Sequence, residues 1–255
     1  AERDLAQIAA MDRAGLAYIT PTLEMDLEGK LTIYLTPRVF WQGGAVYGGK
    51  TNLISYLDRN YTAIETWTYF THEGAHVVAN ALIQPKETGG PDGVLIEGLA
   101  VWATGGHYRR EPIDDLAAVI ADSDSYIPLG TLRAGPFYDL QHEISYMEAG
   151  SFVQFLIERY GLDKFKQLYG QETGKPEEDE LLVESLYDQS YAELETEWLE
   201  YLEGLSPTPE QADAWGFNVR YFDVMRRYQS ELDANARILP GIPTDWTSNT
   251  LSIFT

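Results

Sequence analysis

The chain has 255 residues, 44% of them hydrophobic and 13% aromatic, which is enough for one sizeable core or two modest lobes. Its formal net charge of -22 argues against binding nucleic acid, because phosphate recognition needs clustered Lys and Arg. No apolar run is long enough to cross a bilayer. The sequence contains no Cys, so any metal must be held by His and carboxylate side chains.

The excess of acidic residues is interpreted as serving mainly solubility, with electrostatic recognition of a basic partner as the alternative. The first residue is Ala1, which is not a natural initiator. We therefore expect an N-terminal segment that has been processed or left out, and an extracytoplasmic or secreted protein, with the cytoplasm as the alternative location.

The first third of the chain predicts a short helix followed by a small sheet. Apolar spacing favours a helix over 3–16 that ends at Gly15. Alternation at 31–36 is typical of a strand, and 46–47 and 52–56 predict two more strands, separated by pairs of glycines. These segments are expected to form an antiparallel sheet.

The remainder of the chain has mainly helical patterns, interrupted by a surface loop expected at 175–180. A mostly buried helix is predicted over 61–83, and the tail after Pro240 is expected to be irregular. The other expected helices are 94–103, 112–120, 145–160 closed by Gly161, 162–169, 181–187, 190–202 opened by a capping box, and 208–236.

We therefore predict an α+β fold in two lobes. The N-terminal lobe, 1–84, contains the small antiparallel sheet and the helix over 61–83. The C-terminal lobe, 85–255, is mostly helical. A cleft is expected between the two lobes.

The segment with the clearest chemical content is His72-Glu73-Gly74-Ala75-His76. On a helix, residues four apart lie on the same face, so the two imidazoles can hold one metal ion while Glu73 points at its open position. This pattern predicts a zinc site. The alternative is that the histidines bond neighbouring carbonyls and that Glu73 is a solvated charge.

A hydrolytic zinc site needs a third protein ligand, and Glu97 is the candidate. Glu97 is the only charged residue in the apolar stretch 93–102. A lone carboxylate on a buried face is costly unless it is paired or bound to a metal. The alternative partner is Arg109 or Arg110, in a buried salt bridge.

The combination of His72-Glu73-Gly74-Ala75-His76 with Glu97-Gly98-Leu99-Ala100 resembles the gluzincin zinc metallopeptidases, which share a thermolysin-like catalytic core. In these enzymes the third ligand is a Glu on the next helix. The segment 146–161 resembles the helix that follows in the bacterial peptidase MA-like group, and so does 194–202 with Trp198. The similarity extends over about 31–205.

The resemblance implies that the two lobes form one catalytic domain that binds one Zn²⁺ per chain and hydrolyses a peptide or protein substrate. His72, His76 and Glu97 would hold the zinc, which activates a water molecule. Glu73 would be the general base. The oxyanion partner would be Tyr146, or His142 one turn earlier. The alternative for Tyr146 is packing, with its hydroxyl on a backbone carbonyl.

Two departures from the family pattern affect these expectations. The segment 43–47 is placed where the substrate-binding edge strand would lie. No Glu or Asp occurs between 39 and 57 to bind a free amine, which favours an endopeptidase or a non-standard substrate over an aminopeptidase. No carboxylate follows Glu97 until Glu111, so Thr104, a backbone carbonyl or Asp92 must orient a zinc-binding His. The strength of zinc binding and full activity are therefore left open.

These departures leave two alternatives to an endopeptidase. One is a non-catalytic binding or assembly module that has kept a peptidase fold. The other keeps the metal and hydrolyses an ester or a cell-wall amide. The oligomeric state is left open.

Overall fold

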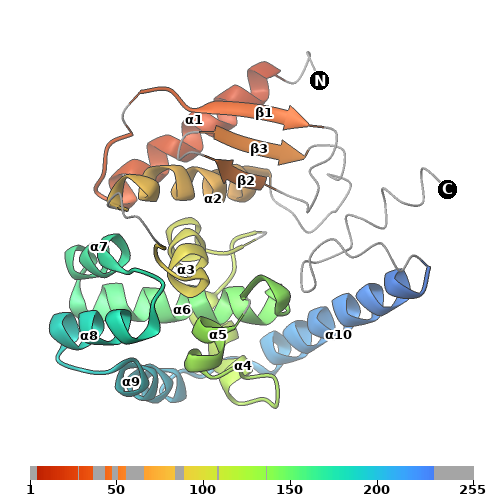
Figure 1. Cartoon of the computed structure of the whole chain (residues 1–255). Helices are drawn as coiled ribbons and strands as arrows, with labels where there is room; N and C mark the ends of the chain where they lie inside the picture. The colour runs from red at the N-terminus through yellow and green to blue at the C-terminus, as the bar shows by residue number, and fades with distance from the viewer. Residues whose placement is uncertain are drawn as a thin grey trace.

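A computed structural model of the chain describes residues 5–27, 29–36, 44–47, 51–55, 66–83, 89–107, 109–135 and 137–232. These residues form ten α-helices, two 3-10 helices and one three-stranded sheet (Figure 1). The elements are α1 (Leu5–Thr22), β1 (Thr32–Thr36), β2 (Gly44–Tyr47), β3 (Thr51–Ser55), α2 (Thr66–Ala79), η1 (Asn80–Leu82), α3 (Gly93–Thr104), α4 (Ile113–Ala121), α5 (Leu129–Ala134), η2 (Phe137–Asp139), α6 (His142–Tyr160), α7 (Leu162–Gln171), α8 (Pro176–Tyr187), α9 (Tyr191–Glu203) and α10 (Pro209–Leu232).

The N-terminal part consists of the sheet with α1 and α2, which lie side by side (Figure 1). The strand order is β1-β3-β2. Strand β1 runs parallel to β3, with Thr32 opposite Thr51, whereas β2 runs antiparallel to β3, with Gly44 opposite Ile54. Among the described strands β2 therefore lies at an edge, and it is in contact with α2.

The prediction of an α+β fold with an antiparallel sheet is wrong. The described part of the chain is mainly helical, and its strands are only four or five residues long. The sheet is mixed, because β1 pairs with β3 and not with β2, its neighbour in sequence. Alternation and turn residues locate strands but do not determine which strands pair. The boundary predicted at 84/85 and the tail after Pro240 lie outside the described residues.

Helix α1 is longer than predicted because Gly15 does not end it. Gly15 is buried inside the helix, and a Cβ there would lie 2.7 Å from Thr71 Oγ1. This glycine therefore serves close packing of α1 against α2, one residue before His72.

Local sequence signals predicted some of the other helix boundaries and missed others. The capping box of Ser190 and Glu193 is present at the start of α9, and Gly161, with φ 94°, ends α6. The loop predicted at 175–180 is wrong, because α8 begins at Pro176. Proline suits the first helical turn, and the acidic residues that follow it interact favourably with the helix dipole. Helix α5 has only six residues and was not predicted.

The core of the helical part is built on the contact between α3 and α6. Gly98 in α3 and Gly150 in α6 allow the two helices to approach closely. A Cβ on Gly98 would lie 2.4 Å from the carbonyl oxygen of Ala149, and one on Gly150 would lie 2.4 Å from Cγ1 of Val101. Helix α3 is thus held with little freedom to move toward α6.

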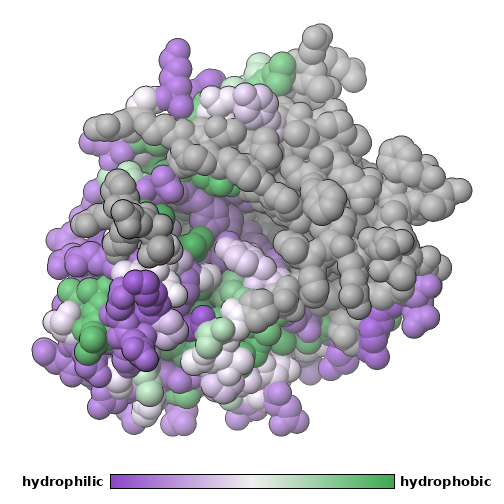
Figure 2. Space-filling model, viewed as in Figure 1, coloured by the Kyte–Doolittle hydropathy of each residue, from purple (hydrophilic) through white to green (hydrophobic). Residues whose placement is uncertain are grey.

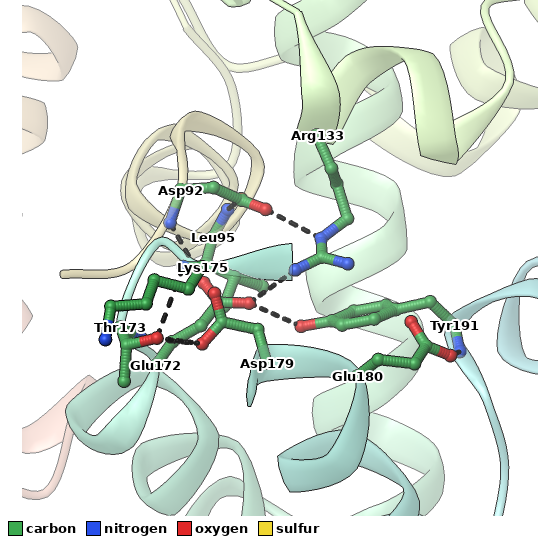
Figure 3. A network of polar contacts seen from close by, with 9 residues as sticks. All are labelled: Asp92, Leu95, Arg133, Glu172, Thr173, Lys175, Asp179, Glu180 and Tyr191. Carbon is green, nitrogen blue, oxygen red and sulfur yellow. Dashed lines mark hydrogen bonds and ion pairs between the residues drawn. The ribbon is translucent and has the colours of Figure 1, made fainter. Parts of the chain in front are cut away.

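The start of α3 is held by a buried polar network (Figure 3). Asp92 caps the helix by accepting a hydrogen bond from the backbone N–H of Leu95. The Arg133 guanidinium donates to Asp92 and Glu172, both at 2.6 Å, and lies over the ring of Tyr191. The network therefore links the first turn of α3 to α5, the end of α7 and the start of α9.

The described surface on the face shown in Figure 2 is largely hydrophilic, with apolar residues in between. Within the described residues, no helix combines the length and apolar character that a membrane span requires.

Candidate metal centre

Helix α2 places His72, Glu73 and His76 within one helical turn. His72 and Glu73 are buried, and His76 is half-buried. The Nε2 atoms of the two histidines lie 3.2 Å apart, and their rings meet edge to face. The spacing of four residues thus brings the two imidazoles together, as the motif predicts.

Helix α3 brings Glu97 to the same point. Its Oε2 lies 3.2 Å from Nε2 of His72 and 3.4 Å from Nε2 of His76, and the residue is 7% exposed. His72, His76 and Glu97 form a group that can hold a metal ion. The prediction that these three residues come together is confirmed.

The spacing of the three atoms fits zinc. Tetrahedral ligands about 2.0 to 2.2 Å from Zn²⁺ lie about 3.3 to 3.6 Å from one another. The three distances here are 3.2, 3.2 and 3.4 Å. Two imidazole nitrogens this close repel unless a proton or a cation lies between them, and a bound cation can contact all three atoms at once. Two His nitrogens and one carboxylate oxygen are also a common zinc donor set.

The electrostatics of the group favour the metal-binding protonation state of His72 and Glu97, whereas the raised pKa of His76 favours a protonated imidazole whose proton a metal would displace. Burial lowers the pKa of His72, whose imidazole is therefore neutral at pH 7. Burial also acts against protonation of His76, but the charges of Glu97 and Glu73, with a hydrogen bond to Glu97, raise its pKa. Burial opposes ionisation of Glu97, yet His76 and His72 hold the pKa of this carboxyl well below its usual range. Glu97 is thus a carboxylate, the form that binds a metal.

The alternative partners of Glu97 are occupied elsewhere. Arg109 pairs with Glu111 at 3.4 Å, and the Arg110 guanidinium lies over the ring of Trp67 at 4.9 Å. Glu97 instead accepts a hydrogen bond of 2.9 Å at Oε1 from the hydroxyl of Tyr138. The alternative of a buried salt bridge between Glu97 and Arg109 or Arg110 is therefore not what the structure shows.

Tyr146 and His142 lie beside the metal-binding group, on α6. The ring of Tyr146 is 5% exposed and stacks on His72 at 6.4 Å between centroids. His142, also buried, lies 4.3 Å from the ring of Tyr146. Their roles as oxyanion partners stay predictions.

The fourth histidine, His107, was not singled out from the sequence. Its ring stacks on Tyr146 at 3.9 Å and lies 5.3 Å from the ring of His72. Burial and the neighbouring histidines His72 and His142 lower its pKa well below the usual range, which makes it a neutral imidazole. All four histidines of the chain therefore gather around this site. The only signal in the sequence that could have pointed to His107 is the small number of histidines, four in 255 residues.

His107 and His142 also line a cavity of about 410 Å³. The cavity is lined by both polar and apolar side chains from the α3–α4 connection, α4, α6 and α10, among them Glu111, Met147 and Trp215. This space is large enough for a side chain of a ligand.

The residues expected to orient a zinc-binding histidine have other partners. The hydroxyl of Thr104 donates to the carbonyl of Gly106 at 2.6 Å, and Asp92 holds Arg133 and the start of α3. Among the residues described, Nδ1 of His72 has no hydrogen-bond partner. The outer-shell acid that the sequence lacks is thus not replaced by Thr104 or Asp92.

Helices α2 and α3 thus supply two histidine nitrogens and one glutamate oxygen, which form a candidate metal centre of the His-His-Glu type. The model of the peptidase MA superfamily matches residues 25–204, which is more than half of the chain. The chain therefore belongs to the peptidase MA superfamily. The searches of curated proteins and of solved structures gave no match.

Proposed function

We propose that this protein is a zinc-dependent metallopeptidase of the gluzincin type that cleaves peptide bonds as an endopeptidase. The observation that carries the proposal is the triangle of donor atoms from His72, His76 and Glu97, whose edges of 3.2 to 3.4 Å match tetrahedral zinc. Membership of the peptidase MA superfamily supports peptides as substrates.

Each side chain has a role that follows from its position. Bound Zn²⁺ would lower the pKa of a water molecule and polarise the substrate carbonyl. Glu73 is buried on the same helix turn, close enough for its charge to raise the pKa of His76. We assign Glu73 to accept the proton of the attacking water and to deliver it to the leaving nitrogen.

The oxyanion partner is proposed to be Tyr146, with His142 as the second choice. The ring of Tyr146 stacks on His72, one of the proposed zinc ligands, whereas the ring of His142 lies beside that of Tyr146. A hydroxyl held by packing on rigid helices provides a fixed hydrogen-bond donor for developing charge.

The substrate is proposed to bind along β2. This strand is at the edge of the sheet and contacts α2, the helix that carries the motif. An edge strand offers unpaired backbone groups to an extended peptide. The lack of an acidic residue between 39 and 57 supports an internal cleavage site over a free N-terminus.

The test combines metal analysis with Glu73→Gln. The purified protein should contain about one zinc per chain, and a peptide-library screen should detect cleavage that a chelator removes and zinc restores. Glu73→Gln should retain the metal and lose cleavage by a factor of about 10² or more, because it removes the general base. A protein prepared without chelators that contains no zinc would refute the proposal.

The unpartnered Nδ1 of His72 favours one alternative, a binding module that has kept the peptidase fold. The same peptide screen separates the two functions. Peptide binding without cleavage, unchanged by Glu73→Gln, would identify the module.

A further inference from the structure

Tyr138 belongs to η2, the short turn that connects α5 to α6, and reaches Glu97 from outside α3. Its hydroxyl donates to Oε1 of Glu97 at 2.9 Å. The other oxygen, Oε2, faces His72 and His76 at 3.2 and 3.4 Å. The two oxygens of this carboxylate therefore have different partners.

The position of Tyr138 is fixed by the residue before it. Phe137 is buried against Gly93, the first residue of α3. A Cβ on Gly93 would lie 2.7 Å from Cβ of Phe137. Because this contact seats η2 directly on the helix that carries Glu97, the phenol of Tyr138 is held against the carboxylate one turn further along α3.

We propose that Tyr138 is a positioning residue that makes Glu97 a one-oxygen ligand of the metal. The inference rests on the proposed zinc site. The hydroxyl occupies Oε1 and leaves Oε2 alone to complete the triangle with the two histidines.

This arrangement matters for the number of open coordination positions. A carboxylate that binds through both oxygens takes two positions around the metal. A hydrolytic site has three protein ligands and needs the fourth position for water or substrate. By holding Oε1, the hydroxyl of Tyr138 keeps that fourth position available.

The contact is also suited to restrain the rotation of Glu97. A charge-assisted hydrogen bond to a carboxylate is stronger than one between neutral groups. Restraining the ligand before the metal arrives lowers the entropy lost on binding. Hydrogen bonds of this outer-shell kind typically contribute a factor of about 10 to 100 in metal affinity.

Tyr138→Phe tests the inference, because it removes only the hydroxyl from a side chain that is 39% exposed. Tyr201→Phe is the matched control. Tyr201 also donates to a carboxylate, Asp114, at 2.6 Å, but it does so between α9 and α4. Circular dichroism and thermal melts establish that both variants are folded.

Zinc affinity is measured by competition with a chromogenic chelator. We expect Tyr138→Phe to bind zinc about 10 to 100 times more weakly than wild type, and Tyr201→Phe to bind it equally well. Equal affinity in wild type and Tyr138→Phe would overturn the inference while leaving the zinc site standing. A wild-type protein that binds no zinc would remove both the inference and the proposed function.

Cobalt substitution tests the one-oxygen geometry directly, without measuring activity. Tetrahedral Co²⁺ absorbs visible light strongly, and the bands weaken when a fifth ligand binds. We expect weaker bands in Tyr138→Phe, where Oε1 is free to bind, and unchanged bands in Tyr201→Phe. An unchanged spectrum in Tyr138→Phe would overturn the assignment of Tyr138 as the group that keeps Glu97 a one-oxygen ligand.

Discussion

The close contact between α3 and α6 makes Gly98→Ala a sensitive perturbation of the metal centre. The new Cβ would lie 2.4 Å from the carbonyl oxygen of Ala149 and 2.6 Å from Cγ2 of Val153. The backbone oxygen cannot rotate away, so the helices must separate by about 1 Å to restore a normal contact. Overpacking of this size costs about 1 to 3 kcal/mol, which the better helix propensity of alanine offsets by up to about 1 kcal/mol.

The shift affects the metal site because Glu97 is next to Gly98 in the chain, whereas His72 and His76 belong to α2. A displacement approaching 1 Å is about a third of the donor distances of 3.2 to 3.4 Å and exceeds the tolerance of about 0.2 Å in metal–ligand distances. We therefore expect Gly98→Ala to lower the free energy of unfolding by about 1 to 2 kcal/mol. We also expect it to weaken zinc binding at least about tenfold, as loss of ligand orientation does.

Urea unfolding with excess chelator measures the first effect, and chelator competition measures the second. Gly130→Ala is the control, because Gly130 lies in α5 and a Cβ there would meet no atom within 4 Å. It should leave zinc binding unchanged and make the fold no less stable. Wild-type stability and zinc affinity in Gly98→Ala would refute the close-packing argument.

Two further predictions concern buried carboxylates of the helical part. Arg133→Met should lower the free energy of unfolding by about 3 to 5 kcal/mol, because it leaves Asp92 and Glu172 buried without their cation. Urea unfolding checks this, and a loss below about 1 kcal/mol, the value of a surface pair, would contradict it. Burial raises the pKa of Glu148 well above its usual range, so this group favours folding most below a pH of about 4.3 and loses that contribution as the pH rises through the folded pKa. Glu148→Gln keeps an acceptor for the N–H of Ile127. The variant should be more stable than wild type at pH 8 but not at pH 4, as measured by unfolding at both pH values. The same pH dependence of stability in both proteins would contradict a raised pKa of Glu148.

The metal-binding group was predictable because local chemistry encodes it. The four-residue spacing of His72 and His76 fixes their shared face on any helix, and a lone Glu97 in an apolar helix needs a buried partner. Tyr138 and His107 reach the site from connections between helices, whose paths depend on tertiary packing. No periodicity in the sequence reports such positions.

The errors in the fold have the same origin. Gly15 has the signature of a helix end, but only the contact with Thr71 reveals that it permits close packing inside α1. The pairing of β1 with β3 likewise depends on contacts between segments distant in sequence. The edge position of β2 follows from this same pairing, because β3 and not β2 lies between the other two strands.

The division of the three ligands between two structural units has a thermodynamic consequence. His72 and His76 belong to the helix that packs with α1 and the sheet, whereas Glu97 belongs to the helix that packs on α6. On the proposed zinc site, one ion would tether the two units, and its binding energy would become part of their shared stability. A metal at 100 times its Kd adds about 2.7 kcal/mol to a fold that binds it only when native. Loss of the metal would then lower the stability of both units as well as abolish the proposed hydrolysis.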